Sequence, residues 1–210
     1  KASERKGRFA VDLHMHSTCS DGELSPTQLV QLANRRGLTS IAITDHDTAS
    51  GFHEAVKASA DTPVNVISGV ELTAFYEREV HILGFFFDPS SPRLNLQFER
   101  QKEVRQQRVQ DICAKLATLN VHIDADDVLA SAGGNVGRPH IAQMLLKHKY
   151  VSNFNEAFQK YLGRNSPGYV DVQRISAEHA IDLIHDGGGI AVIAHPGVEK
   201  LDGRLNALKE

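Results

Sequence analysis

Several short apolar segments of this chain end in a histidine or a carboxylate, and amphipathic segments separate them. This alternation constrains the fold more than any other feature. Four of the apolar segments have the length of a buried strand: 9–13, 40–44, 64–67 and 190–194. The first amphipathic segment has helix signals, because Ser25, Pro26 and Gln28 form a typical helix start and Gly37 a typical end. Alternating strands and helices predict an α/β fold with parallel strands and helices outside them.

The alternation is interrupted after Pro92. Residues 93–132 contain neither glycine nor proline, and their apolar residues recur at helical spacing, so a long amphipathic helix is predicted there. Further helices are predicted at 125–131, 139–147 and 155–162. A short strand at 169–170 and a helix capped by Ser176 then resume the alternation. We therefore expect three parts: an N-terminal barrel part (1–92), a helical insertion subdomain (93–165) and a C-terminal barrel part (166–210).

The composition is that of an ordinary globular protein. Hydrophobic residues make up 41% and charged residues 23%, and the net charge is −3, so disorder and a global basic field are both disfavoured. No apolar run has the length of a membrane span. The two cysteines, Cys19 and Cys113, favour reduced thiols and hence a cytoplasmic protein. From this we expect no membrane association and no obligate protein partner.

Histidines and carboxylates follow the ends of the predicted strands. His14 and His16 follow the first, His46 the second, Glu71 the third and His195 a late one. In parallel α/β folds the carboxyl ends of the strands meet at one edge, so these side chains are predicted to meet there. His14 and His16 are two residues apart and point to the same side of an extended chain. Such a pair taken alone also occurs on ordinary polar strand faces.

The combination of these residues favours a metal site. Burying histidines and carboxylates without partners is costly, and a divalent ion removes that cost. A set of nitrogen and oxygen ligands without thiolates favours manganese, with iron and zinc as alternatives, over calcium or a structural zinc. Two or three ions held together by a bridging carboxylate are suited to phosphoester hydrolysis, in which they activate a water and stabilise the leaving oxygen.

Six short motifs of the chain resemble those of the PHP (polymerase and histidinol phosphatase) family of metal-dependent phosphoesterases. The motifs are 12–17, 20–22, 44–47, 69–71, 81–84 and 194–197. Their order, together with 137–140, 160–164 and 167–170, is most similar to the branch that includes 3′,5′-nucleoside-bisphosphate phosphatases and the 5′→3′ exoribonuclease called ribonuclease AM.

The resemblance implies a distorted (β/α)7 barrel with two or three divalent metal ions. The implied ligands, ion by ion, are His14 with His16; Glu71 as the bridge, with His81 and His195; and Asp21 with His46. Glu71 and His195 are the implied catalytic residues. The implied substrate is a 3′,5′-nucleoside bisphosphate, a short RNA hydrolysed from its 5′ end, or both.

The resemblance is incomplete at the C-terminal end. The family's late Asp-x-His motif has no match after His195, so we expect a barrel that lacks its last strands. This leaves one alternative open, a shortened PHP module with a structural or regulatory role and little activity. A second alternative is a deaminase of the amidohydrolase type, which also begins with an H-x-H pair but fits Glu71 and His81 poorly.

Arg138 and His140 are the predicted substrate-binding residues. They lie at the start of a predicted helix, where backbone N–H groups favour anions, and arginine forms paired hydrogen bonds with phosphate. The plainer interpretation is a surface arginine and a histidine that caps its helix. For Arg100, Arg105 and Arg108 on the long predicted helix, a solvated helix face is favoured over contact with RNA.

Overall fold

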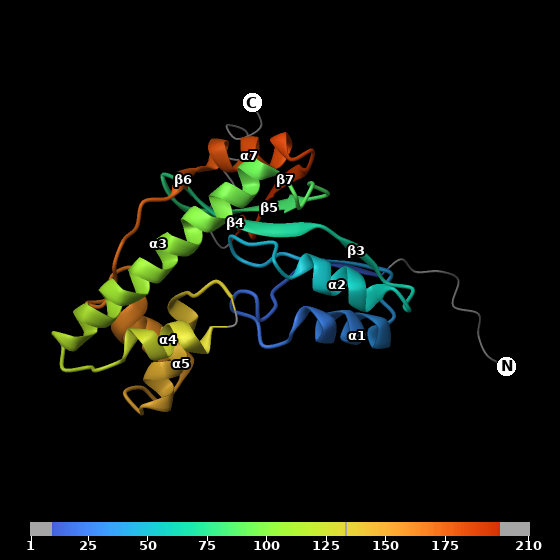
Figure 1. Cartoon of the computed structure of the whole chain (residues 1–210). Coiled ribbons are helices and arrows are strands. Elements are labelled where there is room, and N and C mark those ends of the chain that lie inside the picture. Colours follow the sequence, from blue (N-terminus) through green and yellow to red (C-terminus); the bar gives the residue numbers. More distant parts are fainter. Residues whose placement is uncertain (1–9, 133, 198–210) are drawn as a thin grey trace.

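The computed structural model of the chain describes residues 10–132 and 134–197. Three parallel strands form the first sheet, in the order β1-β2-β3, and two helices, α1 and α2, lie beside it (Figure 1). These elements are β1 (Val11–Met15), α1 (Pro26–Arg36), β2 (Ser40–Ile43), α2 (Phe52–Ser59) and β3 (Asn65–Ile67). The predicted capping box is confirmed: the Ser25 side chain accepts from the Gln28 backbone N–H, and the Gln28 side chain accepts from the Ser25 N–H.

A second sheet follows, in the order β6-β4-β5-β7. Its elements are β4 (Gly69–Tyr76), β5 (Arg78–Phe85), β6 (Ile175–Ser176) and β7 (Ile190–Ile193), with helix α7 (Ala177–Asp186) packed against them. The predicted start of α7 is confirmed, because the Ser176 side chain accepts from the His179 N–H. Within the described residues the strands form two sheets and no closed barrel. The mixed α/β class is therefore confirmed, and the expected count of seven barrel units stays a prediction. The end of the chain, where the last barrel strands are expected to be missing, falls on residues 198–210, outside the described part.

The second sheet corrects the expectation of parallel strands. β4 and β5 form an antiparallel hairpin around Glu77, and β5 is also antiparallel to β7. The hairpin places His81 within β5. His14 and Glu71 also lie within strands, β1 and β4, whereas His16, His46 and His195 follow theirs. Thr73 is opposite His81 and Glu71 is opposite Leu83, so His81 and Glu71 lie diagonally on one face of the sheet.

The helical segment begins at helix α3 (Pro92–Ala117) and continues with α4 (Ala125–Ser131), α5 (Arg138–Lys147) and α6 (Phe154–Ala157), which passes into a π-helical turn (Phe158–Leu162). The long helix and the separate helix predicted at 125–131 are both confirmed, as α3 and α4. Asn120 has a left-handed backbone (φ 60°), and the Val121 N–H donates back to Leu116, which ends α3.

The strand expected at 169–170 is wrong. The carbonyl groups there accept hydrogen bonds from side chains of α3 instead of from another strand. Lys115 donates to the Tyr169 carbonyl and Arg108 to the Val170 carbonyl. Residues 169 and 170 belong to no strand of either sheet.

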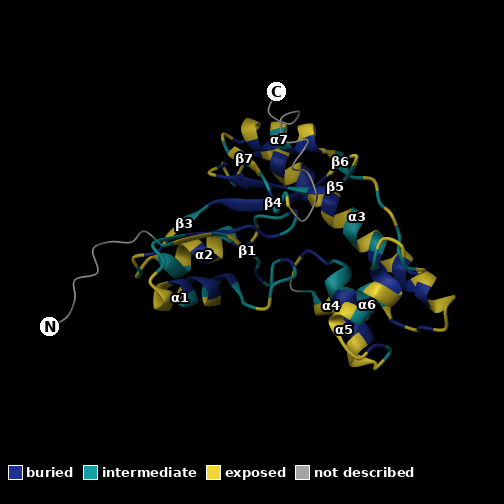
Figure 2. Ribbon diagram, turned by 180° about the vertical axis from the view of Figure 1, so that it is seen from behind, coloured by how far each residue is buried: buried dark blue, intermediate teal, exposed yellow. Residues whose placement is uncertain are grey.

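The two ends of helix α3 pack in two different apolar cores. Leu94 and Phe98, in its first turns, pack with β4, β5 and α7, whereas Ile112 and Leu116 pack with α4 and α5. Figure 2 shows buried positions in both parts of the molecule, and Figure 1 shows α3 running from one part to the other. The second core contains buried residues from 109 to 162 only, which agrees with a helical unit inside the α/β part.

No helix in the described part of the chain is both long enough and apolar enough to cross a lipid bilayer.

Candidate metal centre and adjoining cleft

Glu71 is the central residue of the site. It lies near the start of β4, where the backbone pairs with the segment that follows β2: the Glu71 N–H donates to the Asp45 carbonyl, and the Asp47 N–H donates to the Glu71 carbonyl. This pairing joins the two sheets at the carboxyl end of β2. The Glu71 side chain is only 1% exposed, so its charge needs partners within the protein.

Imidazole groups surround both oxygens of the Glu71 carboxylate. Oε1 lies 2.8 Å from His81 Nδ1 and 3.0 Å from His195 Nε2. Oε2 lies 3.1 Å from His14 Nε2 and 3.0 Å from His16 Nε2. His46 is farther away, with its Nδ1 3.6 Å from Oε2. The carboxylate thus lies between two sets of histidines, with one oxygen facing each set.

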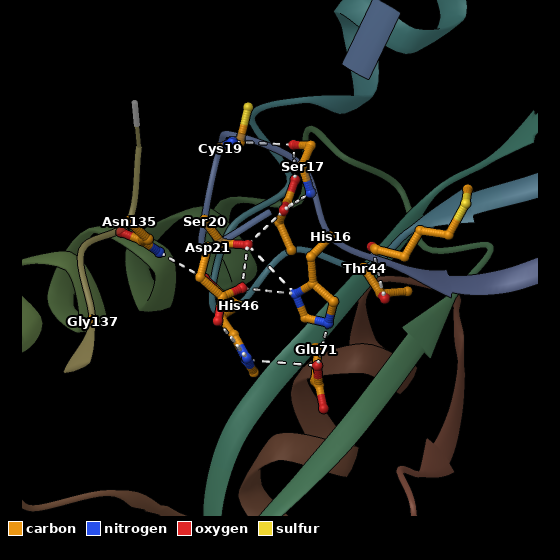
Figure 3. A network of polar contacts seen from close by, with 12 residues as sticks. His16, Ser17, Cys19, Ser20, Asp21, Thr44, His46, Glu71, Asn135 and Gly137 are labelled. Carbon is orange, nitrogen blue, oxygen red and sulfur yellow. Dashed lines mark hydrogen bonds and ion pairs between the residues drawn. The ribbon is translucent and has the colours of Figure 1, made fainter. Parts of the chain in front are cut away.

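Asp21 extends this cluster away from Glu71. Its Oδ1 lies 3.3 Å from His16 Nδ1, and its Oδ2 lies 3.8 Å from His46 Nε2. Figure 3 shows His16 between the two carboxylates, with one ring nitrogen toward Asp21 and the other toward Glu71. Buried Asp45 holds the loop that carries Asp21, because its carboxylate accepts from the hydroxyl groups of Ser17 and Ser20. All seven ligands expected from the sequence therefore lie in one cluster.

The carboxylates create a strong demand for positive charge. Burial disfavours the charged forms, but the hydrogen bonds of His16 with Asp21 and Glu71 outweigh it and raise the His16 pKa to about 10. For the same reason the pKa of Asp21 falls to about 2, and that of Glu71 lies well below its usual range. At His46 the opposite holds, since burial and the charge of Arg105 lower the pKa to about 4.

These residues fit a cluster of divalent metal ions. Two groups each bring three ligand atoms within 4.8 Å of one another: His14 with Glu71 and His195, and His16 with His46 and Glu71. The buried Nδ1 of His46 has no hydrogen-bond partner. Neighbouring imidazole rings are 4.6–5.8 Å apart, so protonating several of them would bring like charges together. Metal ions need neutral imidazoles and ionised carboxylates, which removes this conflict. Glu71 belongs to both groups.

A cleft leads from this cluster to the helical segment. Asp21, His46 and His81 line one end. The other wall carries four arginines, two from α3, one from α5 and one that precedes β6: Arg105, Arg108, Arg138 and Arg174. A cleft with carboxylates and histidines at one end and guanidinium groups at the other suits a substrate that carries phosphates.

Arg108 and Arg138 lie over the ring of Tyr169, 5.4 and 5.7 Å from its centroid. Arg138 also contacts Glu79 and donates to the Leu162 carbonyl. The Nη2 of Arg108 is buried without a hydrogen-bond partner, and burial together with the charge of Arg138 lowers the Arg108 pKa to about 10. An unsatisfied buried guanidinium nitrogen beside a second arginine favours an anion as its partner.

The two predicted substrate-binding residues have different positions. Arg138 lines the cleft. His140 is only 6% exposed, and its Nδ1 accepts from the Gly137 N–H, so it caps the start of α5. Burial lowers the pKa of His140. The plainer of the two sequence interpretations, a helix-capping histidine, describes this geometry.

Sequence reasoning gave little weight to several residues of the cleft. Arg105 and Arg108 were expected on a solvated helix face, but both line the cleft. Their spacing of three residues places them on one side of α3, which was the available signal. Glu79 accepts from Arg174 and pairs with Arg138, and Asn135 contacts the His46 loop. No local motif in the sequence marks these two residues.

Comparison with known proteins gives a consistent family. The model of the PHP domain matches residues 12–175. A 5′-3′ exoribonuclease from Haemophilus influenzae is 40% identical over 186 residues, which cover 88% of this chain and 68% of that protein. A 3′,5′-nucleoside bisphosphate phosphatase from Chromobacterium violaceum is 36% identical over 89% of this chain and 67% of that protein. The chain thus spans about two thirds of the length of these curated relatives.

Solved structures show the same fold. One, described as an amidohydrolase from Chromobacterium violaceum with bound sulfate, has a TM-score of 0.86 and 34% identity, and the match covers 95% of this chain and 74% of that one. Another, from Bifidobacterium adolescentis and assigned as a metal-dependent phosphoesterase, has a TM-score of 0.85 and 33% identity over 91% of this chain and 68% of that one.

Proposed function

This chain belongs to the PHP domain family, and from that premise we propose that it is a metal-dependent phosphoesterase that hydrolyses nucleotide phosphates. The observation that carries the proposal is the position of Glu71. Its buried carboxylate lies between two sets of imidazole nitrogens, at the end of a cleft whose other wall is lined by arginines.

The proposed ligands are the seven clustered residues: His14, His16, Asp21, His46, Glu71, His81 and His195. Glu71 would be shared by two ions, because it belongs to both three-residue groups, one with His14 and His195 and one with His16 and His46. Divalent ions held by these residues would neutralise the phosphate oxygens, lower the pKa of a water and stabilise the leaving oxygen. We propose two or three such ions. Manganese suits this donor set best, with iron or zinc as the alternatives.

Two residues have proposed roles in the reaction itself. Glu71 sets the separation of the two groups, on which the alignment of water and phosphorus depends. His195 follows β7 with a left-handed backbone (φ 30°), which directs its Nε2 toward Glu71 Oε1. Such a backbone is unfavourable for a non-glycine residue and is found preferentially at functional sites.

The arginines supply the proposed substrate contacts. Arg138 and Arg108 flank Tyr169, and the free Nη2 of Arg108 is available to a phosphate oxygen. His140 serves this site indirectly, because its capping bond fixes the start of α5 and with it the backbone of Arg138.

Two substrate classes agree with this geometry. The relatives include a phosphatase of 3′,5′-nucleoside bisphosphates and a 5′-3′ exoribonuclease, and both kinds of substrate carry two phosphates about one nucleotide apart. A deaminase is less consistent with the cleft, since no lysine lines it in the described part of the chain.

The test combines metal content with activity. Protein stripped with a chelator and reloaded with manganese should hold at least two equivalents by elemental analysis. It should release phosphate from a 3′,5′-nucleoside bisphosphate or shorten a short RNA, and renewed chelation should abolish either activity. A reproducible metal content of zero would contradict the proposed centre. Bound metal without any hydrolysis would favour the structural or regulatory module instead.

A further inference from the structure

The segment between α4 and α5 contacts two of the loops that carry the proposed metal ligands. Asn135 makes the contacts on its side. Its backbone N–H donates to the Cys19 carbonyl (2.7 Å), two residues before Asp21. Its side-chain Nδ2 donates to the carbonyls of His46 (2.9 Å) and Asp47 (3.0 Å). Figure 3 shows Asn135 beside these loops, with His46 beyond it toward Glu71. One residue of the helical segment therefore joins two loops that are remote in sequence.

The backbone at Gly134 lies very close to the backbone of Cys19. A Cβ atom on Gly134, the residue before Asn135, would lie 2.1 Å from the Cys19 carbonyl oxygen, which no side chain can accommodate. Asn135 itself is only 6% exposed. Because the site is buried, the two carbonyls that Asn135 satisfies would lose a donor if its side chain were removed, and water has little access to replace it.

Asp47 and Arg105 strengthen the same junction from α3. The buried Asp47 carboxylate accepts from the Thr73 N–H (2.7 Å) and the Thr73 hydroxyl (2.9 Å), which places it beside β4 two residues after Glu71. Its Oδ2 also accepts from Arg105 Nε (2.9 Å) and Nη2. Arg105 donates further to the Val136 carbonyl. The loop that carries His46 is therefore held from both sides.

We propose that Asn135 is a positioning residue for one of the two metal groups. By its contacts it sets the distance between the His46 loop and the Asp21 loop, and so the group formed by His16, His46 and Glu71. Its hydrogen bonds end on Cys19, His46 and Asp47 and involve no atom of His14 or His195. The helical segment is then a structural part of one metal subsite as well as the carrier of the substrate arginines. This inference rests on the proposed metal centre.

The test is selective loss of one metal equivalent. Asn135→Ala should weaken manganese binding at one subsite by about 10- to 100-fold, the usual cost of losing a residue that orients a ligand. The other subsite should keep its affinity. Equilibrium dialysis with elemental analysis of the stripped and reloaded chain measures both. Asn153→Ala is the matched control: it removes an asparagine whose side chain caps α6 in the same helical segment, far from the metal loops in the sequence. It should lower the melting temperature and leave both affinities unchanged.

A double-mutant comparison identifies the subsite. In a His46→Ala background, Asn135→Ala should have little further effect on metal affinity, whereas in a His14→Ala background the two losses should add. Equal weakening of both subsites, or unchanged affinities in Asn135→Ala, would overturn the inference.

A second variant guards against misfolding. If Asn135→Ala gives no folded protein, Arg105→Lys tests the same loop. It keeps the positive charge but cannot bind Asp47 and the Val136 carbonyl together, so it should weaken the same subsite; two unchanged affinities would overturn the inference. A wild-type chain that binds no manganese would refute the proposed metal centre itself.

Discussion

The α/β part and the helical segment are held together by different forces. Inside each part the contacts are apolar: Leu72 and Ile82 lie in one core, and Ile112 and Leu145 in the other. Between the parts, around the cleft, the contacts are polar, as in the pairing of Arg105 with Asp47 and of Arg138 with Glu79. Among the described elements, only helix α3 contributes apolar residues to both cores.

The two parts contribute different chemical groups to the site. The strand ends of the α/β part supply the imidazoles and carboxylates, and the helical segment supplies guanidinium groups and the Asn135 junction. Because the contacts between the two parts are polar, a cleft remains open there, whereas apolar side chains would pack together and fill it. Changes in each part should therefore alter different measurable properties.

The largest expected effect belongs to Glu71, in the α/β part. Glu71→Gln removes the charge that both imidazole sets share, so hydrolysis should fall by about a thousandfold or more. The fold should persist, because glutamine has the same shape. Turnover of the manganese-loaded protein on a nucleoside bisphosphate measures the loss. Glu178→Gln, an exposed change on α7, is the control and should keep full activity. Wild-type turnover in Glu71→Gln would rule out the bridging role.

A core change in the helical segment should affect stability strongly and metal content little. Leu145 is fully buried there, and Leu145→Ala should lower the free energy of unfolding by about 2–5 kcal/mol. Its neighbour Leu146 is 41% exposed, so Leu146→Ala should change the free energy by less than about 0.5 kcal/mol. Urea unfolding compares the two variants. Similar losses in both would mean that the helical segment has no core of its own.

Arg138→Ala should impair the binding of the substrate without changing the binding of metal. Loss of one or two charge-assisted hydrogen bonds should lower kcat/KM for nucleotide substrates by roughly 10- to 100-fold, with metal content unchanged. A small ester such as p-nitrophenyl phosphate should lose less, since it does not extend to the arginine wall. Arg100→Ala, on an exposed face of α3, should have no effect. Equal losses on both esters, or loss of metal, would assign Arg138 a structural role.

The smallest expected effect is local to α1. Ser25→Ala removes a helix cap and should cost about 1 kcal/mol of stability. Because α1 packs only in the α/β part, kcat/KM and metal content should stay at wild-type values. Thermal unfolding and phosphate release together check this. A lost metal equivalent in this variant would show that the two parts are more strongly coupled than their cores indicate.

Local sequence signals predicted the features that depend on neighbouring residues. The capping box at Ser25, the cap at Ser176, the strands 40–43 and 190–193 and the interruption after Pro92 all follow from short-range hydrogen bonding and hydrophobic periodicity. The family and the set of seven candidate ligands were also accessible from the sequence, because short motifs carry them in a characteristic order.

Other features depended on which segments meet in space. The antiparallel direction of β5, which brings His81 to Glu71, is set by a tight turn at Glu77 that no motif marks. The burial of His140 and the exposure of Arg108 to the cleft follow from how α3 and α5 pack. The sequence by itself determined the ligand types and most secondary structure, since these depend on near neighbours. Only the tertiary structure decided which arginines line the cleft beside the proposed metal ligands and that Asn135 joins two of the loops that carry them. Contacts between residues about 90 positions apart leave no local pattern in the sequence.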